Sequence, residues 1–205
     1  PTLTLSSKKS ASMAVRIAAS RRWHALLPHR SVLAVEGADS HKLLQGLTTA
    51  NVQQIGAGPL YTAFLDVKGR VLTDAFLVAV EDGVLIDVEA ASLESLAKHI
   101  KRYKLRSKVS VTDRSDELSV MVNVDPEHNV DPERNEQKAG EALGALGDAS
   151  AALGGAWSDP RLPALGQRAI VRRGANGLLS EQASLTPISP HSSHVIFRMY
   201  HTPIL

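Results

Sequence analysis

One strongly amphipathic segment in the middle of the chain sets the first limit on its fold. The segment "SLESLAKHIKRYKL" (92–105) places Leu93, Leu96 and Ile100 at helical spacing, with charged side chains on the remaining positions. Ser92 stands at its start and is expected to cap it. The sequence therefore predicts one well-defined helix with a single apolar side, which has to pack against another layer of structure.

Strand-like segments lie on both sides of this helix, and a second, shorter helix is expected to begin at Asp39 or Ser40. The predicted strands are 31–37, two strands flanking the Lys68-Gly69 turn, 83–90, 108–113 and 117–124. This order of strand, helix, strands, helix and strands predicts an α+β fold, in which helices cover one face of an antiparallel or mixed sheet. It does not follow the regular βαβ alternation of a dinucleotide-binding fold, and no phosphate-binding glycine motif or H-E-x-x-H motif is found in the sequence.

The C-terminal part has a weaker pattern. The segment 137–155 has alanine and leucine at helical spacing but contains several glycines, and a short strand is expected before Arg172. Beyond Gly174 no period remains, so 175–205 is expected to be a disordered tail. Three histidines in that tail lack a carboxylate or an ordered scaffold, and no metal site is predicted there.

The first 35 residues carry six basic residues and no acidic one, so the rest of the chain is net acidic although the whole chain has a charge of +2. The arginine-, serine- and alanine-rich stretch within 1–30 is typical of a mitochondrial transit peptide, and a disordered basic leader is the alternative. We therefore expect location in the mitochondrial matrix. No apolar run approaches the roughly 18 residues that a membrane helix requires.

Composition excludes several classes of function. The chain has 205 residues, 43% of them hydrophobic, and no cysteine, so it forms no disulfide and no thiolate metal site. Aromatic residues make up only 4%, and the basic charge is concentrated at the N-terminus and not on the folded part. A nucleic-acid partner is therefore not expected.

Three blocks in the folded part together resemble one family. They are "VEGADSHKLLQGLTTANV" (35–52), "YTAFLDVKGRVLTDAFL" (61–77) and "HIKRYKLRSKVSV" (99–111), and they stand in the order and spacing of the YgfZ/GcvT-like proteins. A fourth segment, "SDPRLPALGQRAIV" (158–171), is similar to one found in the mitochondrial branch that assists 4Fe-4S cluster assembly. The resemblance extends from about Leu33 to Arg172, which is the N-terminal half of a typical member.

The resemblance implies the folate-binding domain of the glycine-cleavage aminomethyltransferase, here a partial domain over 31–174. Two functions follow from it: an accessory factor of iron–sulfur cluster assembly that works with A-type iron–sulfur carrier proteins and tetrahydrofolate, or a folate-dependent aminomethyltransferase. The enzyme carries paired acids where this chain has Thr73-Asp74, which favours the accessory factor. The family's later K-G-C-Y block is absent, so we expect a truncated form without independent catalysis.

The predicted ligand-contacting residues lie in the first two blocks. Asp74 is the first candidate among them, because a carboxylate among apolar strand neighbours needs a partner or a ligand. Asp66, Lys68, Arg70, Gln45 and Asn51 complete the predicted set. The three charged turn residues have an equally good explanation as a solvated turn around Gly69, and the two amides as makers of local backbone hydrogen bonds. No catalytic residue and no metal ligand are predicted.

Overall fold

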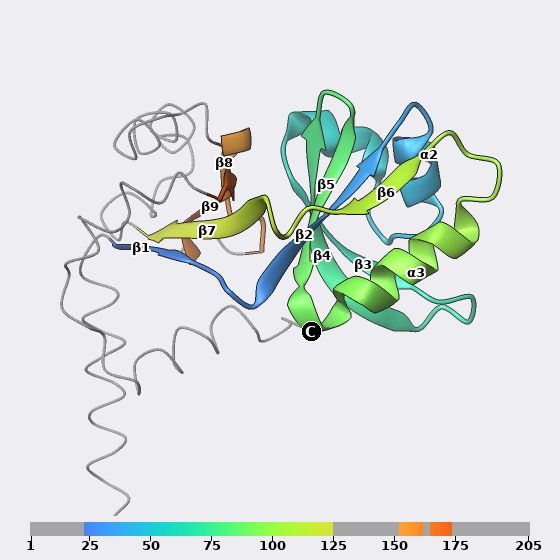
Figure 1. Cartoon of the computed structure of the whole chain (residues 1–205), viewed down its shortest axis with the longest axis horizontal. Helices are drawn as coiled ribbons and strands as arrows, with labels where there is room; N and C mark the ends of the chain where they lie inside the picture. The colour runs from blue at the N-terminus through green and yellow to red at the C-terminus, as the bar shows by residue number, and fades with distance from the viewer. Residues whose placement is uncertain (1–22, 125–151, 162–164, 174–205) are drawn as a thin grey trace, which may run out of the picture.

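The computed structural model describes residues 23–124, 152–161 and 165–173. Its strands form two sheets, one of five strands and one of four (Figure 1). Every strand pairing in both sheets is antiparallel. The α+β class and the antiparallel sheet expected from the sequence are confirmed.

The five-stranded sheet has the order β3-β4-β5-β2-β6. Its strands are β2 (Arg30–Glu36), β3 (Leu60–Leu65), β4 (Val71–Val80), β5 (Gly83–Glu89) and β6 (Ser110–Asp113). The β3–β4 hairpin closes at Gly69, whose φ of 77° lies in the left-handed region that glycine adopts without strain. Five of the predicted strands are therefore found close to their expected positions.

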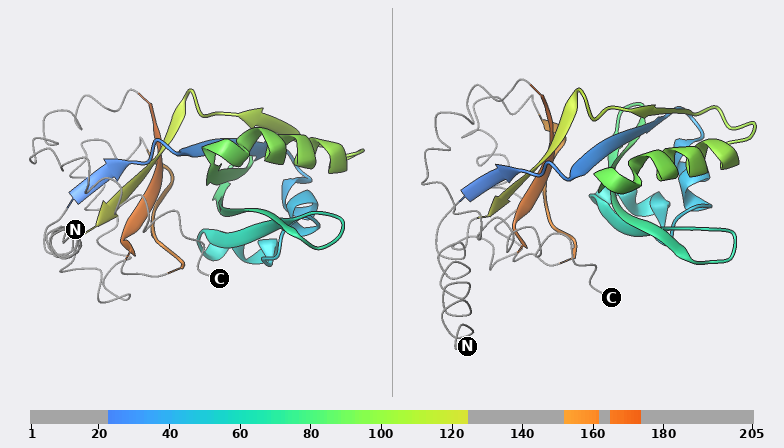
Figure 2. Two further views of the ribbon diagram at one scale, coloured as in Figure 1. Left: turned by 90° about the horizontal axis from the view of Figure 1, so that it is seen from below. Right: turned by 60° about the horizontal axis from the view of Figure 1, so that its bottom comes forward.

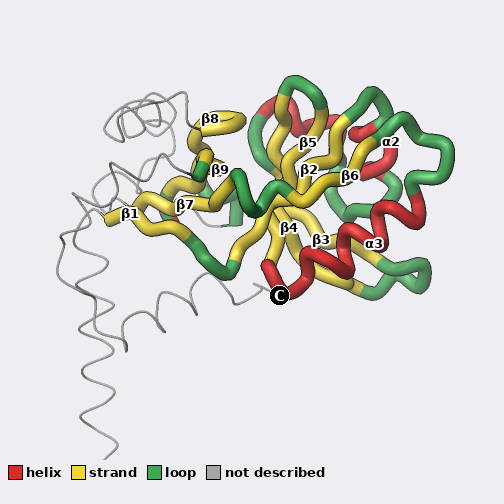
Figure 3. Tube along the Cα trace, in the orientation of Figure 1, coloured by secondary structure: helices red, strands yellow, loops and turns green. Residues whose placement is uncertain are grey.

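The four-stranded sheet has the order β1-β7-β9-β8. Its strands are β1 (Trp23–Leu26), β7 (Leu118–Val124), β8 (Ala152–Ser158) and β9 (Gln167–Arg172). The chain passes between the sheets twice, from β1 into β2 and from β6 into β7, through short loops (Figure 3). Because β2 pairs with β6 in one sheet and β1 pairs with β7 in the other, the two connecting loops join neighbouring strands of each sheet.

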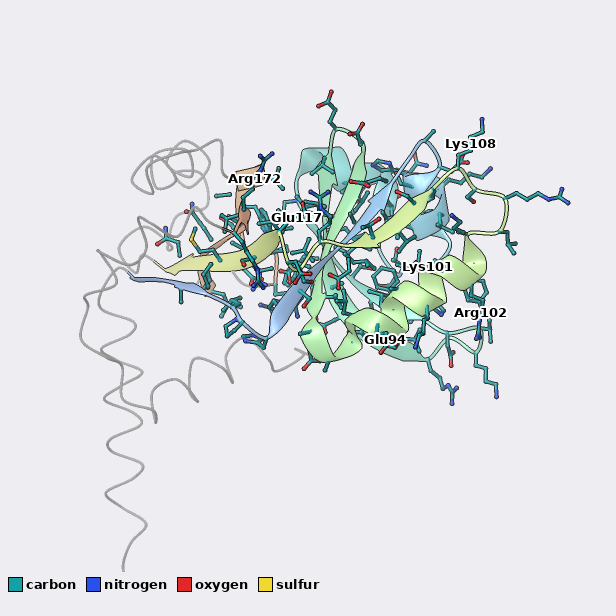
Figure 4. All side chains as sticks on the ribbon, viewed as in Figure 1. Glu94, Lys101, Arg102, Lys108, Glu117 and Arg172 are labelled. Atoms are coloured by element: carbon teal, nitrogen blue, oxygen red, sulfur yellow. The ribbon has the colours of Figure 1, made fainter. Side chains whose placement is uncertain are left out.

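The helices lie on the side of the five-stranded sheet that faces away from the second sheet (Figure 1, Figure 2). They are α2 (Ser40–Gln45), α3 (Leu93–Tyr103) and the 3-10 helices η1 (Val52–Ala57) and η2 (Ala90–Ser92). Leu44 of α2, Ile55 of η1 and Leu96 and Ile100 of α3 are buried against this face of the sheet. The exposed side of α3 carries Glu94, Lys101 and Arg102 (Figure 4). The predicted single-sided helix is confirmed, and Ser92 stands at its N-cap position, but the Ser92 side chain makes no cap hydrogen bond, contrary to the expectation.

The opposite face of the five-stranded sheet packs against the four-stranded sheet. Val32 of β2 and Leu85 of β5 share one buried cluster with Val120 of β7, Trp157 of β8 and Ile170 of β9. Alternate residues of β2, β4 and β5 therefore serve two separate cores, one beneath the helices and one between the sheets. This explains why these strands are apolar at almost every position.

The first and third sequence blocks meet at the end of β2. Gly37 has a φ of 122°, and a Cβ atom at this position would lie 2.2 Å from the carbonyl oxygen of Lys108. Two residues on, the Asp39 carboxylate accepts a hydrogen bond from the Lys108 backbone N–H at 2.7 Å. Asp39 stands at the N-cap position of α2 as predicted, but its side chain makes this contact and no cap hydrogen bond.

The first and second blocks are joined by polar threonines and backbone. The Thr49 hydroxyl accepts from the Ala63 backbone N–H at 3.1 Å, and the Thr62 hydroxyl accepts from the Ala50 N–H at 3.0 Å. The segment after α2 thereby runs along the outer edge strand β3, whose backbone donors would otherwise lack a strand partner. The three blocks that identify the family are thus interlocking parts of one fold.

The structure corrects two predicted boundaries. The sequence assigned residues 23–30 to the leader by their composition, but Trp23–Leu26 form β1, which pairs with β7, and the buried Arg30 begins β2. Residues 152–155, assigned to a helix with several glycines, begin β8. In both cases pairing with a neighbouring strand of the sheet outweighs local composition, because strand formation depends on tertiary context more than on the segment itself. The remaining predictions for 1–22, 125–151 and 174–205 lie outside the described residues.

The Gly37 contact makes a testable prediction about stability. Gly37→Ala should lower the free energy of unfolding by about 2 kcal/mol or more, because the new methyl group meets the Lys108 carbonyl and the backbone conformation disfavours an L side chain. Gly56→Ala is the matched control, since no atom outside its neighbours lies within 4 Å, and its effect should stay within about 0.5 kcal/mol. Urea unfolding measures both, and equal losses would contradict the steric explanation.

Candidate functional site

The alternation of side chains along β4 directs Asp74 away from the helices. Thr73 and Ala75 face the helix side, and Asp74 and Phe76 face the second sheet. On the neighbouring strand β3, Tyr61 lies directly opposite Phe76 and diagonally across from Asp74. The Tyr61 hydroxyl donates a hydrogen bond to Oδ2 of Asp74 at 3.0 Å. The carboxylate predicted to need a partner therefore has one.

This pair keeps its proton on the phenol. Burial of the ring, then the negative charge of Asp74 and the hydrogen bond to it, raise the pKa of Tyr61 to about 12. Tyr61 and Asp74 are both half-buried, and the rings of Tyr61 and Phe76 lie 5.2 Å apart between centres. The site thus presents a carboxylate and a phenol at the edge of an aromatic surface.

Arginines surround the inner part of this aromatic surface. The guanidinium carbons of Arg168 and Arg161 lie 4.4 and 4.9 Å from the centre of the Phe76 ring. Arg30 completes the group at 5.7 Å. Cation–π contacts of this kind are strongest where water is excluded, and Phe76 is fully buried.

Two buried carboxylates, Asp87 and Asp159, bind these three arginines. Asp87, which is 0% exposed, accepts from Arg30 Nε and from Arg168 Nη2, each at 2.6 Å. Burial works against its charged form, but the charges and hydrogen bonds of the two guanidiniums outweigh burial and lower the pKa of Asp87. Asp159 is bound through both oxygens by Arg161, at 2.9 and 2.7 Å. The five groups form one ionic network between the two sheets.

The arrangement suits recognition better than bond-breaking. Among the described residues, Tyr61 is the one side chain that donates to Asp74, so Oδ1 of this carboxylate is left to accept from a ligand N–H. The phenol keeps its proton and the guanidiniums are always protonated, so neither Tyr61 nor the arginines can act as a nucleophile. A ligand that carries N–H groups fits the chemistry of this edge.

The predicted turn residues Asp66, Lys68 and Arg70 lie together at the tip of the β3–β4 hairpin. The Asp66 carboxylate accepts from the backbone N–H groups of Lys68 and Arg70, at 2.8 and 2.9 Å, and from Arg70 Nε at 2.8 Å. These backbone and side-chain bonds from Arg70 lower the pKa of Asp66. These hydrogen bonds show that Asp66 stabilises the turn, whereas Lys68 is exposed.

The predicted amides Gln45 and Asn51 lie together between α2 and η1, on the helix side of the molecule. Gln45 Oε1 accepts from the Val52 backbone N–H at 2.8 Å. Asn51 Oδ1 accepts from the Gln53 N–H at 3.2 Å and caps η1. These are the local backbone bonds that the sequence offered as the alternative to ligand contact, and they do not converge with Asp74.

Thr73 bears on the comparison with an enzyme that carries paired acids. Its side chain faces the helix side and lines a surface hollow of about 290 Å³ together with His99 and Arg102. A carboxylate at this position would project away from Asp74 and would not share its site. The threonine at position 73 is therefore weaker evidence against a transferase activity than the sequence alone suggested.

Sequence reasoning missed Tyr61, Arg161, Asp87 and the arginines that hold it. Tyr61 could have been found from the hairpin, since strands that fold back at Gly69 bring its side chain beside those of Asp74 and Phe76. Arg161 carried no such signal. Within the described ranges no group of three potential metal-binding side chains occurs, and no helix is long and apolar enough to cross a membrane.

Known proteins share both the sequence and the fold of this chain, although no family model matches it. The mitochondrial iron–sulfur cluster assembly factor IBA57 homologue of Mycosarcoma maydis is 32% identical over 79% of this chain and 40% of its own length. The protein of the same name from Neurospora crassa is 32% identical over 80% of this chain and 38% of its own length. That of Pyricularia oryzae is 46% identical over 42% of this chain and 23% of its own length.

Among solved structures, the glycine cleavage system aminomethyltransferase T of Bartonella henselae has a TM-score of 0.56 at 12% identity, covering 80% of this chain and 45% of that chain. The two sheets and the helix layer thus define a protein of the aminomethyltransferase type of fold. The resemblance to the YgfZ/GcvT-like family is thus confirmed: the chain is similar in sequence to mitochondrial iron–sulfur cluster assembly factors and in fold to an aminomethyltransferase. The chain spans about 40% of the length of these two curated relatives, which are named as mitochondrial proteins.

The ionic network predicts a stability effect that depends on pH. Asp87→Asn should lower the free energy of unfolding by about 3–5 kcal/mol near neutral pH, because two buried guanidiniums lose their counter-charge. The pKa of Asp87 is lowered in the folded state, so its contribution is present above about pH 4 and is lost as the pH falls further. The difference in free energy of unfolding between wild type and Asp87→Asn should therefore become smaller at acidic pH.

Glu117→Gln is the control for this measurement, since Glu117 pairs with Arg114 at the exposed surface (Figure 4). It should change the free energy of unfolding by less than about 1 kcal/mol. Chemical unfolding at several pH values tests both variants. A small effect of Asp87→Asn that does not vary with pH would contradict the network.

The Tyr61–Asp74 pair predicts a shift in phenol titration. Asp74→Asn should lower the pKa of Tyr61 from about 12, because the negative charge that disfavours the phenolate is removed while burial remains. Tyrosinate absorbance between about pH 9 and pH 11 should then be greater for the variant than for wild type. Asp116→Asn, at an exposed acid, should leave the curve unchanged, and identical curves for all three proteins would exclude the contact.

Proposed function

We propose that this chain is the folate-binding-type part of an accessory factor for mitochondrial 4Fe-4S cluster assembly, located in the matrix. The observation that carries the ligand assignment is the half-buried Asp74 carboxylate, which accepts a hydrogen bond from Tyr61 on Oδ2 and from no other side chain of the described residues. The printed names of the curated relatives support the assembly role and the location. By the same family resemblance, its protein partners are A-type iron–sulfur carriers.

Asp74 and Tyr61 supply the chemistry that a reduced folate needs at a binding site. The tetrahydropteridine ring carries N–H groups, which the Asp74 carboxylate would accept as charge-assisted hydrogen bonds. Tyr61 would hold the carboxylate in place and line the same edge with its ring. Asp66, Lys68, Arg70, Gln45 and Asn51 stay predictions of a wider contact set, and their local hydrogen bonds explain them without a ligand.

The alternative function is a folate-dependent aminomethyltransferase of the glycine-cleavage type. The shared fold makes it a genuine competitor, but fold similarity at 12% identity does not carry an activity. The relatives with 32% identity are named as assembly factors, which favours the first function. Glycine-cleavage turnover by the purified chain, above a blank without protein, would reverse this preference.

Calorimetric titration with tetrahydrofolate tests the ligand site. Asp74→Asn should weaken binding by about tenfold or more, because a hydrogen bond to a charged group is lost. Asp116→Asn is the matched control at an exposed carboxylate and should bind as wild type does. Equal heats for wild type and Asp74→Asn would remove Asp74 from the site, and no heat for wild type would count against folate binding itself.

A further inference from the structure

The aromatic surface beside Asp74 is already covered by a side chain of the protein. The guanidinium carbon of Arg161 lies 5.6 Å from the centre of the Tyr61 ring and 4.9 Å from that of Phe76. The Arg161 side chain is only 4% exposed. A planar guanidinium over two rings occupies the same place that a flat ligand ring would take for stacking.

Arg161 is firmly held in this position. Asp159, which is 1% exposed, binds its Nε and Nη2 through two different carboxylate oxygens and its backbone N–H at 3.0 Å. Asp159 itself donates its backbone N–H to Gly166 O at 2.9 Å. Two parallel charge-assisted bonds fix the plane of the guanidinium as well as its position. The segment after β8 therefore places Arg161 over the rings by its own local contacts.

The polar edge of the site differs from its aromatic part. Asp74 and Tyr61 are half-buried, whereas Phe76 is 1% exposed beneath the arginines. The polar edge is thus more exposed than the ring beneath the arginines, and a ligand ring cannot stack on Phe76 or on the covered side of Tyr61 while Arg161 keeps this position. Arg161 also stands close enough to Asp74 for their charges to interact.

We infer that Arg161 is a specificity-determining residue of the Asp74 site, which fills the stacking position so that a ligand is selected by its hydrogen bonds to the polar edge and not by stacking of its ring. This inference rests on the proposed ligand site at Asp74. It predicts that the site discriminates poorly between flat ring systems and well between ligands with and without N–H groups. Removing the guanidinium should turn the same edge into a ring-stacking site.

Binding measurements with two probes test the inference. Titration of Arg161→Ala with tetrahydrofolate, and with pterin as the ring alone, should give affinities about tenfold higher than for wild type, since stacking becomes available to the ring. Arg172→Ala is the matched control, at the exposed last residue of β9 (Figure 4). Affinities that are unchanged or lower in Arg161→Ala, while wild type binds, would overturn the role of Arg161.

A second measurement separates this inference from the folate assignment. Nitration of Tyr61 by tetranitromethane, read by mass spectrometry, should be several-fold faster in Arg161→Ala than in wild type or Arg172→Ala. Faster nitration without any folate binding would support the covering role and count against the proposed function. Unchanged nitration would overturn the covering role even if folate binds. If Arg161→Ala does not fold, Arg161→Lys retains the charge beside Asp159, removes the flat guanidinium, and replaces it in both tests.

Discussion

The carboxylate of Asp87, buried between Arg30 and Arg168, is the interaction on which the remaining structure depends. It connects the middle of the five-stranded sheet to β9 of the other sheet, through hydrogen bonds of 2.6 Å on both sides. Buried charges are costly unless they are paired and hydrogen-bonded in good geometry, so the position of each partner constrains that of the next. Phe76, packed against these guanidiniums, and the Asp74 edge beside it acquire their places from this network.

The site that results is divided into two chemically different parts. Its inner part consists of three arginines bound by two buried carboxylates, over a covered ring, and these contacts give it rigidity. Its outer part is the Asp74 carboxylate together with the Tyr61 phenol, which stays protonated. Both residues are half-buried, and within the described residues the carboxylate accepts from no side chain other than Tyr61. Such a division favours holding a ligand in one orientation over transforming it, and it agrees with the assembly role named for the relatives. The ionic network between the sheets and the Asp74 edge are thus in direct contact through Phe76 and Tyr61.

Local patterns predicted most of the five-stranded sheet and its helices, because the spacing of apolar residues in a strand or a helix can be recognised within a short stretch of sequence. Helix 93–103 and the β3–β4 hairpin are such cases. The charge network could not be predicted in this way, since its pairs are 57 and 81 residues apart in the chain. Asp74 was found because a strand acid is locally conspicuous, whereas Arg161 looks in sequence like any arginine in a proline-containing turn.

The pairing of β1 with β7 has a consequence for the maturation of the protein. A presequence removed on import has to end before Trp23, because cutting at the boundary suggested by composition would take away the outer strand of one sheet. A cut after residue 30 would also remove the guanidinium that balances Asp87. Arg30 therefore belongs to the folded core and not to a leader.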